Sequence, residues 1–171
     1  MTAARTFTEL LFWQRARQWS KDIYHLTQQS AFARDRRLVI QINDSSESVM
    51  ANVAEGFGRS TQEQFLMFLS YAIGSLDETK SHLCAAYDRG YLDKDQFARL
   101  FQEGTEIRKM TVAFIRSMIQ PGGGVRTLGK TPTWSNQVWE LYERVTGKPR
   151  PAEFESTRDP PPPPRNDDPP V

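Results

Sequence analysis

Apolar residues recur every three or four positions along most of residues 8–120, which is the spacing of side chains on one face of an α-helix. Breaks in this pattern divide the region into four stretches, and we expect helices over residues 8–29, 36–55, 60–89 and 93–120. No stretch alternates with the period of two that is typical of a β-strand. The pattern therefore predicts an all-α domain.

Each predicted helix carries one continuous apolar face. The faces of the third and fourth helices repeat in steps of four and three, the spacing of a packed helix seam. Because the connections are only a few residues long, neighbouring helices should pack antiparallel, which gives an up-down-up-down four-helix bundle. The residues expected in its core are Leu10, Trp13, Ala16, Ser20, Ile23, Thr27, Leu38, Ile42, Ser45, Val49, Val53, Phe65, Leu69, Ala72, Leu76, Thr79, Leu83, Ala86, Phe97, Leu100, Gly104, Ile107, Thr111, Phe114 and Met118.

Polar and glycine residues mark the expected helix ends. Thr8, Ser60 and Asp93 stand where a side chain can accept a hydrogen bond from the first free amides of a helix, and Ser60 also opens the pattern of a capping box. Gly56 and Gly90 follow the last apolar residues of the second and third helices. Glycine there favours the left-handed backbone that stops a helix.

The chain has 11 prolines, and all of them lie beyond residue 120. Proline removes a backbone donor and clashes with the preceding helical turn, so residues 1–120 can be helical throughout while residues 160–164 cannot. We therefore assign residues 1–120 to the four-helix bundle and residues 121–171 to a flexible tail. The proline-rich end of this tail is expected to be largely disordered.

Within the tail, residues 135–146 have the pattern of a short amphipathic helix that Ser135 can cap and Gly147 can stop. Three turns are marginally stable alone in water, so this helix should dock on another surface. Two alternatives stay open: the bundle of the same or a neighbouring subunit, or a groove of another protein. The candidate docking residues are Trp134, Val138, Trp139, Leu141, Tyr142 and Val145.

The predicted helices carry more apolar residues than one narrow face accounts for. Homo-oligomerisation would explain the surplus, because it buries helices on two sides. A wide monomer core with scattered exposed aromatic residues is the other explanation. The surplus residues are Leu11, Phe12, Trp19, Phe68, Tyr71, Ile73, Phe101, Met110 and Ile115.

The composition favours binding over catalysis. Lys and Arg total 22 against 21 Asp and Glu, so a charged partner would have to recognise a local patch. The single cysteine excludes an internal disulfide, and no apolar run reaches the roughly 20 residues of a membrane span, so we expect a soluble, cytoplasmic protein without a membrane partner. No catalytic, cofactor or metal-ligand spacing is present, and we predict no enzyme activity; an enzyme that uses Glu55 or Cys84 is the alternative.

Basic residues form small clusters on the first helix, before the second helix and before the third. In an oligomer such clusters are repeated and can hold a phosphate backbone at several points. The alternative is a set of ordinary solvated side chains that Asp22, Asp35 and Glu47 balance. The candidate nucleic-acid or anion-binding residues are Arg15, Arg17, Lys21, Arg34, Arg36, Arg37 and Arg59.

Several short segments together resemble one known family. Residues 52–59 read Asn-Val-Ala-Glu-Gly-Phe-Gly-Arg, and with residues 7–10, 13–16 and 65–76 they resemble the four-helix-bundle proteins encoded in intervening sequences of bacterial 23S ribosomal RNA genes. The resemblance covers residues 7–119 and implies a homopentamer of antiparallel bundles with no known enzyme activity. Similar accessory proteins of diversity-generating retroelements bind nucleic acid and a reverse transcriptase, which implies RNA or DNA and that enzyme as alternative partners.

The chain departs from this family pattern in the second helix. Asn43 and Asp44 stand where such proteins commonly carry consecutive basic residues, so a basic stripe is weakened there. Our main hypothesis is therefore a non-enzymatic, homo-oligomeric scaffold of the intervening-sequence type. A nucleic-acid-binding accessory factor of a reverse transcriptase is the alternative.

Overall fold

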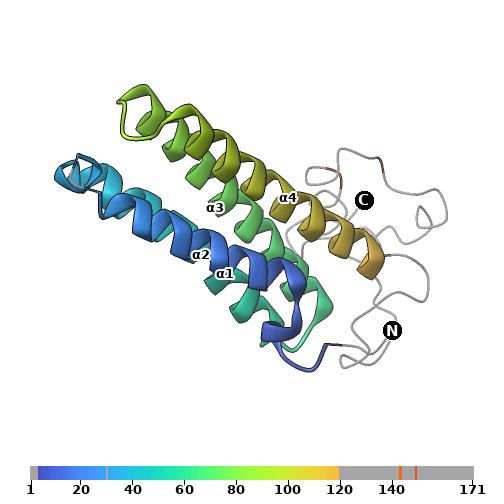
Figure 1. Ribbon diagram of the computed structural model, residues 1–171. Coiled ribbons are helices and arrows are strands. Elements are labelled where there is room, and N and C mark those ends of the chain that lie inside the picture. Colours follow the sequence, from blue (N-terminus) through green and yellow to red (C-terminus); the bar gives the residue numbers. More distant parts are fainter. Residues whose placement is uncertain (1–3, 30, 120–142, 144–148, 150–171) are drawn as a thin grey trace, which may run out of the picture. The chain divides into compact units, whose positions relative to one another are not determined.

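The computed structural model describes residues 4–29, 31–119, 143 and 149, and Figure 1 shows four long helices side by side with aligned axes. No strand occurs among these residues, so the predicted all-α, four-helix fold is confirmed. The tail helix predicted near 135–146, its docking residues and the proline-rich end lie outside the described residues, except for Glu143 and Pro149. The elements are η1 (Phe7–Glu9), α1 (Leu11–Thr27), η2 (Phe32–Arg34), α2 (Arg36–Phe57), α3 (Gln62–Asp88) and α4 (Lys94–Ile119).

The predicted apolar faces form the core. Every expected residue of α2 and α3 is buried, and among the others only Trp13, Phe97 and Phe114 are half-buried. The core is also wider than the narrow faces, because it takes in four of the nine surplus apolar residues. These four are Phe12, Trp19, Ile73 and Ile115. Leu11 and Tyr71 remain 66% and 49% exposed.

Adjacent helices meet in reversed order, so that residue numbers fall in one helix as they rise in its neighbour. The contacts that show this order are Ser20–Ser46 and Thr27–Asn43 between α1 and α2, Ser45–Thr79 and Ser48–Ser75 between α2 and α3, Lys80–Thr105 and Asp77–Arg108 between α3 and α4, and Arg15–Glu103 and Asp22–Arg99 between α1 and α4.

Trp19 is the largest fully buried side chain and lies against a glycine of the opposite helix. A Cβ atom on Gly104 would stand 2.8 Å from Cζ2 of the indole. The Trp19 ring therefore occupies the space that a side chain at position 104 would need. The indole N–H donates to the carbonyl of Leu100 at 2.9 Å. Gly104 therefore serves as a notch that lets α1 and α4 approach closely.

The expected role of Gly56 was wrong. This residue does not stop α2 with a left-handed backbone; it is buried inside the helix, which ends one residue later at Phe57. A Cβ atom here would lie 2.6 Å from Cβ of Phe68 and 2.9 Å from Cδ2 of Phe65. The glycine is thus required because α3 passes too close to this turn of α2 for any side chain.

Two of the predicted helix starts were also wrong. Thr8 lies within the short helix η1, and α1 begins after Leu10 without a side-chain cap. The cap of α3 is Thr61 rather than Ser60, and its hydroxyl accepts from the amide of Gln64 at 3.2 Å. The two N-cap positions thus lie two residues and one residue later than predicted, and the apolar faces of the helices are unchanged.

The turn between α3 and α4 follows the prediction. Gly90 has a φ of 72°, and its amide and that of Tyr91 donate back to the carbonyls of Tyr87 and Ala86, each at 2.9 Å. This is the Schellman arrangement that ends many helices. Asp93 then caps α4 by accepting from the amide of Gln96 at 2.7 Å.

Asp35 ties this turn to the start of α2. One carboxylate oxygen accepts from the amide of Leu38 at 3.3 Å, and the other accepts from Arg89 at 2.5 Å and from the Tyr91 hydroxyl at 3.2 Å. The Tyr91 ring also stacks on Phe32, with 5.0 Å between ring centroids. The hydrogen bond from Arg89 is the main cause of a lowered pKa for Asp35.

We expect Gly56→Ala to reduce the free energy of unfolding by about 1–3 kcal/mol, because the added methyl group overpacks the contact with Phe65 and Phe68. Urea denaturation followed by circular dichroism measures the change. Gly58→Ala is the matched control, since its Cβ would lie at an ordinary 3.5 Å from the Glu55 carbonyl. Equal losses in the two variants would contradict the close approach of α2 and α3.

We expect Asp35→Asn to destabilise the protein at pH 7, because asparagine keeps the cap but loses the charge that faces Arg89. The lowered pKa means that the stabilisation is complete above the ordinary pKa of 3.8 and is lost as pH falls through the lower folded-state value. The difference in unfolding free energy between variant and wild type should therefore be largest near neutral pH and shrink as the Asp35 carboxyl becomes protonated in acid. A difference that stays constant with pH in urea titrations would argue against this contact.

Candidate functional site

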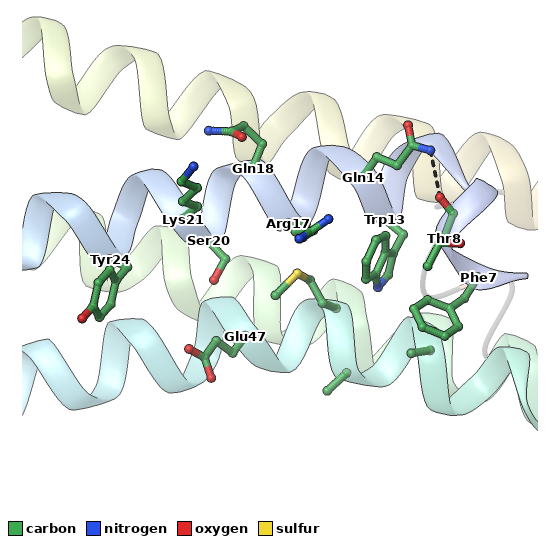
Figure 2. Close-up of a pocket in the computed structure, with 13 residues that line it drawn as sticks. Phe7, Thr8, Trp13, Gln14, Arg17, Gln18, Ser20, Lys21, Tyr24 and Glu47 are labelled. Carbon is green, nitrogen blue, oxygen red and sulfur yellow. Dashed lines mark hydrogen bonds between the residues drawn. The ribbon is translucent and has the colours of Figure 1, made fainter.

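An open groove of about 1200 Å³ lies between α1 and α2. Figure 2 shows side chains of α1 along one wall and Glu47 of α2 along the other, with η1 at one end. The lining residues are Phe7, Thr8, Trp13, Gln14, Arg17, Gln18, Ser20, Lys21, Tyr24, Glu47, Met50, Ala51 and Ala54. We refer to this feature as the α1–α2 groove.

The α1 wall of the groove presents two cations between two aromatic rings. Trp13, Arg17, Lys21 and Tyr24 follow one another at spacings of four, four and three residues, which places them along one side of the helix. Tyr24 is 50% exposed, and both cationic side chains are exposed. The Arg17 guanidinium lies 6.0 Å from the centroid of the Trp13 ring, at the outer limit of a cation–π contact.

The end of the groove is built by η1. Nε2 of Gln14 donates to the carbonyl of Thr8 at 2.8 Å, and the Phe7 ring meets Trp13 edge to face with 5.0 Å between centroids. These contacts hold η1 against the first turn of α1. Nε1 of Trp13 is buried here and has no acceptor among the described residues, an arrangement that typically costs about 1–3 kcal/mol.

The α2 wall leaves space because its side chains are mostly small. Ala51 and Ala54 contribute only methyl groups, Met50 is half-buried, and Glu47 brings one exposed carboxylate. α2 also packs more closely on α3 than on α1. The groove therefore combines a mostly apolar α2 wall with a mixed α1 wall that carries aromatic rings, amides and two cations, which suits the binding of an amphipathic polypeptide segment rather than bond chemistry.

Two of the predicted basic residues are already paired. Arg15 donates to both carboxylate oxygens of Glu103, at 2.7 and 2.6 Å, and this hydrogen-bonded pair raises the pKa of the guanidinium. Arg59 pairs with Glu55 one turn earlier and lies 4.8 Å from the centroid of the Phe68 ring. Their charge is thus largely compensated within the chain.

The remaining predicted basic residues fall in two places. Arg17 and Lys21 come together in the α1–α2 groove. Arg34, Arg36 and Arg37 lie around the start of α2 and are exposed. The 22 residues of α2 separate that cluster from Arg59 by about 33 Å along the helix, so the seven residues do not form one patch.

A second uncovered surface lies on α3. Met67 and Tyr71 are 40% and 49% exposed, and a Cβ atom on Gly74 would meet nothing within 4 Å. Glu78 follows on the same side of the helix, with 59% of its side chain exposed. We call these four residues, which recur at spacings of four, three and four, the α3 outer stripe.

Glu55 and Cys84, the residues of the enzyme alternative, lie on α2 and α3. The described residues hold no group of three or more His, Cys, Asp or Glu side chains that could bind a metal ion. Glu55 is engaged by Arg59, and the Cys84 thiol is half-buried among helical neighbours. None of the described helices is both long and apolar enough to cross a membrane.

Sequence reasoning found part of these surfaces. It identified Arg17 and Lys21, but it assigned Trp13 to the core and did not connect them to Tyr24 or to the α2 wall. The feature of the sequence that could have indicated the α1 wall is Tyr24, which follows Lys21 by three residues on the polar side of the helix. On α3 the signal was Gly74, a glycine in the middle of a helix that no turn or core contact requires.

A solved structure of another protein shares the fold. A crystal structure of a protein of unknown function from the S23 ribosomal protein family of Bacteroides thetaiotaomicron VPI-5482 aligns with a TM-score of 0.55 and 20% sequence identity. The alignment covers 62% of this chain and 99% of that chain. No curated protein matches the chain. At this level of identity the structural likeness supports the fold alone.

The family resemblance seen in the sequence is confirmed by a family-wide comparison. The sequence profile described as 23S rRNA-intervening sequence protein matches residues 8–113, which span most of η1, all of α1 to α3 and most of α4. The match includes both walls of the α1–α2 groove and the α3 outer stripe. The chain therefore belongs to the 23S rRNA-intervening sequence protein family.

Proposed function

We propose that this protein is a non-enzymatic, homo-oligomeric scaffold that presents repeated surfaces to a partner. The observation that carries the proposal is the uncovered α3 outer stripe. Residues 64–76 contain no charged side chain, although Met67 and Tyr71 lie on the solvent side of α3. A helix that is uncharged on its exposed side is typical of burial against another element.

The distribution of exposed apolar residues supports assembly. Leu11 and Ile40 are 66% and 59% exposed on α1 and α2, in addition to the residues of the α3 outer stripe. The core already takes in Phe12 and Trp19, so the remaining apolar surface is not a consequence of an unfilled interior. We propose five copies, the number that the family resemblance implies.

A role in nucleic-acid binding is the second candidate. Arg17 and Lys21 make no ion pair among the described residues and lie between the rings of Trp13 and Tyr24. Cations interleaved with aromatic rings suit a single strand, whose bases stack and whose phosphates need neutralisation. The pairing of Arg15 within the chain weakens this candidate, because it reduces the available positive charge.

For the scaffold we expect a particle whose mass is a fixed multiple of the 19.7 kDa chain, with five copies as the proposed number. Light scattering coupled to size-exclusion chromatography measures this mass at several protein concentrations. A species of one chain mass throughout the concentration series would rule out the scaffold proposal.

For nucleic-acid binding we expect labelled single-stranded RNA to be retarded at low salt and released as salt rises. The double substitution Arg17→Gln with Lys21→Gln should then lower the slope of log K against log salt by about one to two. Arg15→Gln serves as the comparison, because Glu103 already compensates that charge. The absence of a shift at low salt for the wild-type protein would remove this candidate.

A further inference from the structure

We propose that the α3 outer stripe of one copy packs into the α1–α2 groove of the next copy. This inference rests on the proposed homo-oligomer and assigns its interface to two different surfaces of the same chain. The stripe is a ridge with an open position at its centre, and the groove is a hollow in which aromatic rings and small apolar side chains alternate with polar ones. Neither surface has an occupant within the described chain.

The stripe has the features of a helix that docks by its outer side. Met67, Tyr71, Gly74 and Glu78 extend over about three turns, or roughly 17 Å at 1.5 Å per residue. Glycine lowers helix stability relative to alanine, and no contact among the described residues explains Gly74. A glycine at the centre of the ridge instead allows the helix backbone to approach a partner closely.

The groove matches the stripe in length and in character. Its α1 wall runs from Trp13 to Tyr24, which is the same rise along a helix, roughly 17 Å. Met50 and the aromatic rings of the groove offer apolar contact to Met67 and Tyr71. A helix laid into an apolar groove and anchored at successive turns is a recurring mode of protein recognition.

The charges of the two surfaces are opposite. The groove carries two exposed cations, Arg17 and Lys21, against one exposed carboxylate, Glu47, so its balance is positive. The stripe ends in the exposed carboxylate of Glu78, which lies 3.7 Å from His82. Asp77 lies beside Glu78 and is itself exposed, 3.5 Å from Arg108. Complementary charges of this kind favour the intended partner and set its register.

The proposed contact joins unlike surfaces, so it is heterologous. Each copy then offers one free stripe and one free groove, and repeated contacts generate a closed ring or an open filament rather than a simple two-fold dimer. This property separates the proposal from any interface in which the α3 outer stripes of two copies meet each other. It also provides a direct test.

The test uses two variants that each block one surface. Gly74→Arg places a large cation on the stripe, and the open space around Gly74 lets the bundle fold unchanged. Arg17→Glu with Lys21→Glu reverses the charge of the groove. Each variant alone should elute as a single chain in size-exclusion chromatography with light scattering. An equimolar mixture should form a dimer, because one intact stripe meets one intact groove.

Charge reversal supplies a second measurement. Glu78→Lys should weaken assembly at least about tenfold in dissociation constant, and combining it with Arg17→Glu and Lys21→Glu should recover most of that loss. Ala98→Arg is the control for Gly74→Arg, because it adds an arginine at an exposed position of α4 outside both surfaces. It should leave assembly unchanged. Circular dichroism confirms that every variant keeps its helices.

The outcomes separate this inference from the scaffold proposal. A wild-type protein that is always a single chain defeats both. An oligomeric wild type whose assembly survives both blocking variants, or whose blocked variants fail to combine on mixing, overturns the inference and leaves the scaffold. Intact assembly together with loss of RNA binding in the Arg17→Glu, Lys21→Glu variant also overturns it and assigns the groove to nucleic acid.

Discussion

The bundle depends on helices that approach each other more closely than side chains normally permit. Trp19 reaches from α1 into space that a Cβ atom on Gly104 would occupy, and its indole N–H finds an acceptor in the α4 backbone. α2 and α3 repeat the same device at Gly56, which lies against Phe65 and Phe68. Since close-packed interiors do not tolerate added atoms, these two contacts constrain how closely α1 lies to α4 and α2 lies to α3.

This constraint also explains why the outside of the bundle is uneven. Serine, threonine and asparagine side chains between α2 and α3 are small and hydrogen-bonded to one another, as in the pairs Ser45–Thr79 and Ser48–Ser75, so these helices lie close together. α1 and α2 also share hydrogen bonds, Ser20–Ser46 and Thr27–Asn43, but these helices pack less closely, and a groove remains beside small residues such as Ala51. The surfaces that are open to a partner are therefore determined by which pairs of helices pack closely and which leave a groove between them.

The periodic pattern of apolar residues was sufficient to predict the helices and most of the core. Each face is a property of neighbouring residues in one helix, so it can be read locally. Caps were less reliable: Asp93 and Gly90 matched, whereas Thr8 and Ser60 did not, because a start can move by a residue or two when the preceding turn tightens. Gly56 was predicted to stop the helix because the sequence alone does not distinguish a glycine that close packing requires from one that a turn requires.

The local sequence was enough to establish an all-α, four-helix chain of this family, since helix periodicity and short motifs lie within contiguous segments. Three-dimensional packing was needed to show that Glu103 compensates Arg15, that Trp13 and Glu47 face one groove, and that Gly74 stands in open space. These features join residues from different helices or depend on what surrounds a position. They therefore depend on how the helices pack, and this packing cannot be derived from any single segment of the sequence.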